Sequence, residues 1–140
     1  MNDQPQFVLV GHCSADSSSL SRAIGQAYPH ARIASVSDQT SLAKKLDANG
    51  QSEGAARSVL LVNRVLDGDF AAEGGVELIR ELAQSPAAPV MLLISNFDDA
   101  QDAAVAAGAV RGFGKSQLNQ PATRQALVGA LEKAKAVQGA

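Results

Sequence analysis

The sequence predicts an α/β protein, a three-layer sandwich in which a doubly wound sheet of five parallel strands lies between two layers of helices. Three apolar runs, at 7–10, 59–62 and 90–94, are too short for helices and do not alternate with polar residues. Such runs are typical of parallel strands buried on both faces. Weaker strand-like segments lie at 32–36 and 110–113. A helical segment follows each strand, and this alternation implies right-handed crossovers.

Composition agrees with a single domain. The chain has 140 residues, which is about the length of one domain. Hydrophobic residues make up 46% of the chain and aromatic residues only 4%, so the core must consist mainly of Ala, Val, Leu and Ile. We therefore expect one domain over residues 1–140, with a core from about 7 to 135.

The first two helical segments have recognisable ends. The serine-rich run 14–19 offers several N-caps for the first segment, and Pro29 ends it. Asp38 is the expected cap of the second segment, and Gly50 is its expected stop. Two long loops follow, at 49–57 and 64–74.

The remaining helices are expected to start near Gly75, Asn96 and Ala122. Asn96 is a candidate N-cap, two aspartates in the next turn suit the helix dipole, and Gly108 ends this fourth helix. Residues spaced on one face of each helix should point to the core. They are Leu20, Ala23, Ile24, Ala27, Leu42, Ala43, Leu46, Leu78, Ile79, Leu82, Leu127, Ala130, Leu131 and Ala134.

Charge and hydropathy exclude several classes of function. The net charge is −2, and no cluster of Lys and Arg offers affinity for a phosphate backbone. No apolar run approaches the roughly 20 residues that span a bilayer, and the N-terminus does not resemble a signal peptide. Cys13 is the single cysteine, which suits a reducing compartment. We expect a cytoplasmic protein that binds neither nucleic acid nor membrane.

The expected site lies beyond the carboxyl ends of the strands, where doubly wound sheets bind ligands. The residues that follow the strands there are Gly11, His12 and Cys13, then Asn63 and Arg64, then Ser95 and Asn96, and finally Lys115.

Four segments of the chain resemble the receiver domain of two-component response regulators, such as CheY. They are SVLLVN ending at Asn63, GGVELIREL after a loop, PVMLLIS ending at Ser95, and AAGAVRGFGKS containing Lys115. The resemblance spans residues 7 to about 133 and implies the flavodoxin-like strand order 2-1-3-4-5. In that family, an Asp after the third strand accepts a phosphoryl group in a phosphorelay. It also holds Mg²⁺ together with two acidic residues after the first strand, while a Ser or Thr and a Lys contact the phosphoryl oxygens.

Only the last two of these positions are matched, by Ser95 and Lys115. Gly11 and His12 stand where the family has its acidic pair, and Asn63 stands at the acceptor position. An amide is a poor nucleophile, and without carboxylates little Coulomb attraction offsets the dehydration of Mg²⁺. We therefore expect a degenerate receiver, or pseudo-receiver, that is not an enzyme, is not phosphorylated on aspartate in the usual way, and holds no metal or other cofactor.

The fifth strand also departs from the family. Gly112 stands where an aromatic switch residue is usual, and Phe113 comes one position later. Either the strand slips by one residue or the usual switching is absent. A slip would turn Phe113 to the opposite face of the sheet.

Several residues allow both a structural and a functional interpretation. His12 and Cys13 should point to opposite sides of an extended segment and share no site. The serines at 14–19 could cradle phosphate, although capping is favoured. Asp67 and Asp69 could fold back and pair with Lys115, although an Asp-Gly turn with solvated charges is favoured.

Two classes of function follow. The first is a noncatalytic signalling module that contacts a protein partner or a second copy. By resemblance, its contact face consists of the fourth helix, the fifth strand and the fifth helix, with parts of 96–107, Arg111 and 122–137. The alternative is a metal-independent sensor of a small anion or small molecule, which would use His12, Arg64, Ser95 and Lys115. A flavodoxin-like enzyme is disfavoured because no glycine-rich phosphate loop is present.

Overall fold

The computed structural model of the chain describes residues 6–48, 58–84 and 88–139. Its strands are β1 (Gln6–Val10), β2 (Arg32–Val36), β3 (Ser58–Asn63), β4 (Val90–Ile94) and β5 (Val110–Phe113). Its helices are α1 (Ser14–Ala27), α2 (Gln39–Ala48), α4 (Gly75–Leu82), α5 (Asp98–Ala107) and α6 (Pro121–Gly139), with a short 3₁₀ turn, η1 (Lys115–Gln117). The loop predicted at 49–57, with Gly50, and the side chain of Leu46 lie outside the described part of the chain.

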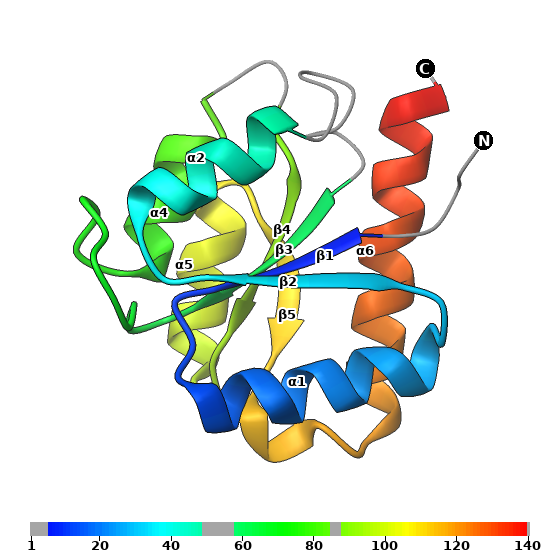
Figure 1. The fold of residues 1–140 in the computed structure, drawn as a ribbon. Helices are drawn as coiled ribbons and strands as arrows, with labels where there is room; N and C mark the ends of the chain where they lie inside the picture. The colour runs from blue at the N-terminus through cyan, green and yellow to red at the C-terminus, as the bar shows by residue number, and fades with distance from the viewer. Residues whose placement is uncertain (1–5, 49–57, 85–87, 140) are drawn as a thin grey trace.

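The strands form one parallel sheet in the order β2-β1-β3-β4-β5. Figure 1 shows α1 and α6 on one side of this sheet and α2, α4 and α5 on the other. The direction of winding reverses between β1 and β3, where Val10 lies beside Val62. This is the switch point at which such sheets form their sites, and the predicted fold class and strand order are confirmed.

The face of the sheet under α1 and α6 carries the two buried phenylalanines, Phe7 and Phe113. Leu20 and Ile24 of α1, with Leu127 and Leu131 of α6, form one apolar cluster with alternate strand residues such as Leu61. These side chains are at most 4% exposed. Removing such side chains from water is the main stabilising contribution to the fold.

The opposite face is covered by three helices. Leu42 of α2, Leu78 and Ile79 of α4, and Ala104 of α5 pack in a second cluster against the other alternate residues of the strands. The central strands therefore have no exposed face, which is why their sequences are continuous apolar runs. No helix in the described part of the chain is long and apolar enough to cross a membrane.

The predicted helix ends are partly confirmed. Asp38 caps α2 because its Oδ1 accepts a hydrogen bond from the backbone N–H of Ser41 at 2.7 Å. Gly108 ends α5 with a φ of 123°. The serine caps of the first helix are wrong: α1 begins at Ser14 after Cys13, which makes no side-chain cap, so the serine run lies inside the helix.

The slip of the fifth strand is observed. Val110 pairs with Leu92, but Phe113 pairs with Ile94, so β5 has one residue more than β4 over this stretch, as in a β-bulge. Phe113 is 3% exposed and belongs to the cluster under α1 and α6. At Gly112 a Cβ would lie 2.1 Å from the carbonyl oxygen of Leu93, so only glycine fits there.

Candidate functional site

A cleft of about 200 Å³ opens at the carboxyl ends of β3 and β4. It is lined by Asn63, Arg64, Val65, Ile94, Ser95, Asn96, Phe97 and Lys115. Five of the residues predicted to follow strand ends therefore meet here, from three different strand ends. The other three, Gly11, His12 and Cys13, are not among the lining residues.

Asn63, at the expected acceptor position, holds two strands together. It is the last residue of β3, and its Nδ2 donates to the carbonyl oxygen of Gly11 at 2.9 Å. Its amide thus supplies a hydrogen-bond donor that a carboxylate lacks. A carboxylate in the same place would face a carbonyl oxygen, and two acceptors repel each other. The geometry therefore suits an amide and not an ionised acid.

The loop after β3 occupies the space above Gly11. Gly11 has a φ of 75°, and a Cβ on it would lie 2.7 Å from Cδ2 of Leu66. The backbone N–H of Asp67 donates to the carbonyl oxygen of Gly11 at 2.9 Å. Leu66 therefore fills the space above Gly11, where the resemblance would place an acidic side chain, and any larger residue at 11 would require Leu66 to move.

The same loop continues to the end of β2. The N–H of Asp69 donates to the carbonyl oxygen of Ser37, and the N–H of Gln39 donates to the carbonyl oxygen of Asp69, both at 2.9 Å. Asp67 and Asp69 are thus held beside β1 and β2. The suggested pairing of either carboxylate with Lys115 is wrong, because within the described residues Lys115 makes its ion pair with another residue.

That residue is Asp16, in the first turn of α1. Its Oδ2 lies 2.6 Å from Nζ of Lys115, and both side chains are about one-third exposed. The hydrogen bond from Lys115 lowers the pKa of Asp16, and one from the thiol of Cys13 lowers it further. Sequence reasoning missed Asp16 because it lies inside the run 14–19, which was interpreted as a source of helix caps. The available signal was its place one turn after β1, at the edge of the sheet where Lys115 also lies.

His12 belongs to the core behind the switch point. It is 8% exposed, and its Nε2 lies 2.9 Å from the carbonyl oxygen of Leu61. Burial lowers the pKa of His12, so the ring is neutral at pH 7 and donates through Nε2–H. Cys13 is exposed, and the two adjacent side chains separate as predicted. A role for His12 in contacting an anion in the cleft is not supported.

The mouth of the cleft is apolar and cationic. The guanidinium of Arg64 lies over the ring of Phe97, 5.1 Å from its centroid, in a cation–π contact. Phe97 is 61% exposed and Val65 is 60% exposed. Arg64 therefore covers an aromatic ring at the rim.

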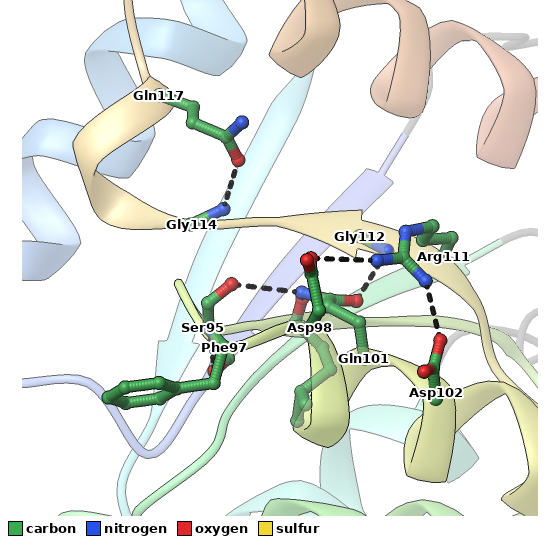
Figure 2. A network of polar contacts seen from close by, with 10 residues as sticks. Ser95, Phe97, Asp98, Gln101, Asp102, Arg111, Gly112, Gly114 and Gln117 are labelled. Carbon is green, nitrogen blue, oxygen red and sulfur yellow. Dashed lines mark hydrogen bonds and ion pairs between the residues drawn. The ribbon is translucent and has the colours of Figure 1, made fainter.

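Ser95 and Asn96 shape the two turns that border the cleft. The Oγ of Ser95 accepts a hydrogen bond from the N–H of Phe97 at 3.1 Å (Figure 2), which is the local structural role favoured for it. Asn96 was expected to cap α5, but that is wrong because α5 begins at Asp98 after Phe97. The Oδ1 of Asn96 instead accepts from the N–H and the Oγ of Ser116, at 3.2 and 2.9 Å.

The metal of the resembled family does not fit these residues. Mg²⁺ needs carboxylate oxygens and near-octahedral geometry. The carbonyl oxygen of Gly11 already accepts from Asn63 and Asp67, and the ring of His12 contacts Leu61. In the residues that the structure describes, no three His, Cys, Asp or Glu side chains gather in a way that could hold a metal ion.

The predicted contact face lies beside the cleft. A groove of about 500 Å³ runs between α5, β5 and the start of α6, and its lining includes Ser95, Gln101 and Arg111. On its border Arg111 pairs with Asp98 at 3.0 Å and with Asp102 at 2.9 Å. We call these three residues the Arg111 cluster; Figure 2 shows the guanidinium between the two carboxylates.

No family model and no curated protein matches the sequence, but solved structures are similar to the fold. The signal receiver domain of a DNA-binding response regulator (merR) from Colwellia psychrerythraea 34H has a TM-score of 0.67 and 15% identity, over 92% of this chain and 99% of that one. The response regulatory domain of mrkE from Klebsiella pneumoniae has a TM-score of 0.64 and 16% identity, over 96% and 98%.

A third similar structure is a response regulator from Burkholderia pseudomallei, which was solved with a phosphorylated aspartic acid, a calcium ion and citrate. Its TM-score is 0.59 at 17% identity, over 97% of this chain and 72% of that one. Identities this low establish the fold alone. The chain has the CheY-like, flavodoxin-like fold of response regulator receiver domains.

Proposed function

We propose that this chain is a receiver-like signalling module that acts through protein contacts and accepts no phosphoryl group on aspartate. One observation carries the proposal: the side chain at the acceptor position, Asn63, is an amide that donates to the carbonyl oxygen of Gly11. That side chain thus has a structural role that an ionised acceptor could not fulfil.

Two further contacts support the proposal. Leu66 fills the space above Gly11 where an acidic ligand would project. Lys115, which in the family contacts the phosphoryl group, is paired with Asp16. A phosphoryl site needs an acceptor, metal ligands and a cation. Here the acceptor and the metal ligands are replaced by other residues, and the cation is paired with a carboxylate.

The proposed contact surface is the face built from α5, β5 and α6. It carries the Arg111 cluster, and Val105 of α5 is 45% exposed. Its occupant is a protein partner or a second copy of this chain. The alternative, a sensor of small anions, has less support because His12 does not line the cleft and Lys115 already has a carboxylate partner.

Intact-protein mass spectrometry after incubation with Mg²⁺ and an acyl phosphate tests the central claim. We expect the mass to stay unchanged while a receiver that carries the acceptor aspartate, treated in parallel, gains one phosphoryl group. An acid-labile phosphoryl adduct on this chain would refute the proposal.

The contact surface has its own test. Partners are first captured by cross-linking to this protein in cells. The sedimentation coefficient of the protein is then measured over a range of concentrations, with and without these partners. We expect it to change when Arg111 is replaced by Glu. Arg22, which is exposed on α1, provides the matched control Arg22→Glu. Equal effects of the two variants would place the contact elsewhere.

A further inference from the structure

Gln101 connects three elements of the fold through one buried side chain. It lies in α5 and is 4% exposed. Its Nε2 donates to the carbonyl oxygens of Leu93 at 2.9 Å and Ser95 at 3.1 Å. Its Oε1 accepts from the backbone N–H of Gly112 at 2.9 Å. The amide thus reaches β4, the turn after it, and β5, as Figure 2 shows in part.

The contact lies where the sheet is irregular. The pairing of β4 with β5 shifts between Leu92 and Ile94, and a bulge leaves backbone groups without their regular ladder partners. The carbonyl of Leu93 and the N–H of Gly112 are at this point, and both bind Gln101 instead. The side chain therefore substitutes for missing strand-to-strand hydrogen bonds.

Two partners of Gln101, Ser95 and Gly112, belong to different surfaces of the protein. Ser95 lines the cleft and accepts from the N–H of Phe97, which forms the rim. Gly112 follows Arg111, the centre of the Arg111 cluster. Gln101 thus lies between the wall of the cleft and the proposed contact face.

We propose that Gln101 is a positioning residue that couples the cleft to the Arg111 cluster, because its amide holds the end of β4, the β5 bulge and α5 in one arrangement. The proposal stands on these contacts and does not depend on whether the chain takes part in signalling.

The physical reason is the cost of unpaired buried polar groups. If α5 moved relative to β4 or β5 alone, Gln101 would lose some of its partners, and the carbonyl groups left behind at Leu93 and Ser95 belong to buried residues. Separate movements are therefore unfavourable, and a displacement at Ser95 should be passed on to Gly112 and Arg111. Polar groups that are bonded in a network of this kind respond together.

The first measurement uses the unmodified protein. We expect the side-chain NH₂ protons of Gln101 to exchange with solvent at least about tenfold more slowly than those of Gln120, which is exposed. Equal exchange rates for the two amides, followed by NMR, would overturn the proposal without any substitution.

The second measurement tests the coupling. Ser95→Ala removes the hydroxyl that accepts from Phe97, and its effect on the amide resonances of Gly112 and Arg111 is followed in three backgrounds. We expect clear shifts in the wild-type background and none in the Gln101→Met background. The Gln117→Met background is the matched control, because Gln117 Oε1 also accepts from a glycine N–H, that of Gly114 at 2.9 Å, but only within its own turn.

The outcomes are decisive in both directions. Shifts that persist in Gln117→Met and vanish in Gln101→Met support the coupling. Shifts of equal size in all three backgrounds, or no shift at Gly112 in the wild-type background, overturn it. If Gln101→Met does not fold, Gln101→Asn takes its place, because it keeps the amide but is too short to reach all three partners.

Discussion

The ammonium of Lys115 lies 2.6 Å from the carboxylate of Asp16, and this ion pair joins η1 to the first turn of α1. The two residues are far apart in the sequence, but both follow strand ends at the same edge of the sheet. The pair neutralises the single lysine of the cleft lining. A carboxylate from a helix thus engages the cation that receiver chemistry would direct to a phosphoryl group.

Replacing Asp16 by Asn should lower the free energy of unfolding by about 1 kcal/mol, because the pair is partly exposed and screened by water. Urea denaturation measures the change, and Lys115→Met with the double variant completes a cycle that isolates the pairing energy. Asp99→Asn, at an exposed position of α5, is the control. Additive single effects in the cycle would show that the pair contributes nothing.

The pH dependence of this difference has a definite sign. The pKa of Asp16 is lowered in the folded protein from its ordinary value of 3.8, mainly by the hydrogen bond from Lys115. The contribution of the Asp16–Lys115 pair to the free energy of unfolding is therefore fully present above pH 3.8 and is lost as the pH falls through the lowered pKa of Asp16. The stability difference between wild type and Asp16→Asn should shrink in strong acid, and a difference independent of pH would contradict the assignment.

A carboxylate placed at position 63 should not make the chain accept a phosphoryl group. Asn63→Asp removes the donor to Gly11 and places a carboxylate opposite a carbonyl oxygen, at a cost of about 1–3 kcal/mol in unfolding free energy. Asn119→Asp makes the same change at an exposed turn and should be nearly neutral. Denaturation curves and intact mass after acyl phosphate treatment check both statements. Unchanged stability together with a phosphoryl adduct on Asn63→Asp would contradict them.

The strands could be predicted from the sequence because their pattern has a direct physical cause. Residues 59–62 are all apolar, and all are buried since helices cover both faces of the sheet. The residues at the strand ends could be located for the same reason, because parallel strands bring their carboxyl ends to one edge. This is why Asn63, Ser95 and Lys115 meet in one cleft as expected.

The contacts of these residues could not be predicted, since they depend on how loops and helix ends are placed. Asp16 and Asp67 are both short acidic side chains near strand ends, so the signal that places Asp16 at the edge of Lys115 applies equally to Asp67 and does not show which one reaches the lysine. Gln101 lies in a helix at a position that no sequence pattern marks. Its bond to Gly112 depends on the bulge in β5, and the spacing of residues in the sequence did not decide between such a slip and an absent switch.

His12 should make the protein less stable in mild acid. Its pKa is lowered by burial from the ordinary value of 6.5, so the unfolded chain takes up the proton more readily than the folded one. Stability is therefore complete above pH 6.5 and decreases as the pH falls below it. His12→Gln, which keeps an N–H donor but does not titrate in this range, should show a flatter pH profile between about 7 and 5.

The other histidine supplies the control for this measurement. His30 is exposed, and His30→Gln should leave the pH profile of unfolding as it is in wild type. Parallel profiles for wild type and His12→Gln would contradict the assignment of a buried, neutral ring.

Gly11→Ala should destabilise the fold. The φ of 75° disfavours any side chain, and the new Cβ would meet Cδ2 of Leu66 at 2.7 Å, so a loss of about 2 kcal/mol or more is expected. Gly25→Ala is the matched control, because Gly25 lies in α1 with nothing within 4 Å of a new Cβ. That change should stabilise the helix by about 0.5–1 kcal/mol.

A second substitution separates the two causes at Gly11. Leu66→Ala removes the side chain that a Cβ would meet, so in this background Gly11→Ala should cost less, and the remainder reports the backbone conformation alone. Chemical denaturation of the four proteins gives the cycle. If Gly11→Ala costs as much in the Leu66→Ala background as in the wild-type background, then Leu66 does not fill the space above Gly11.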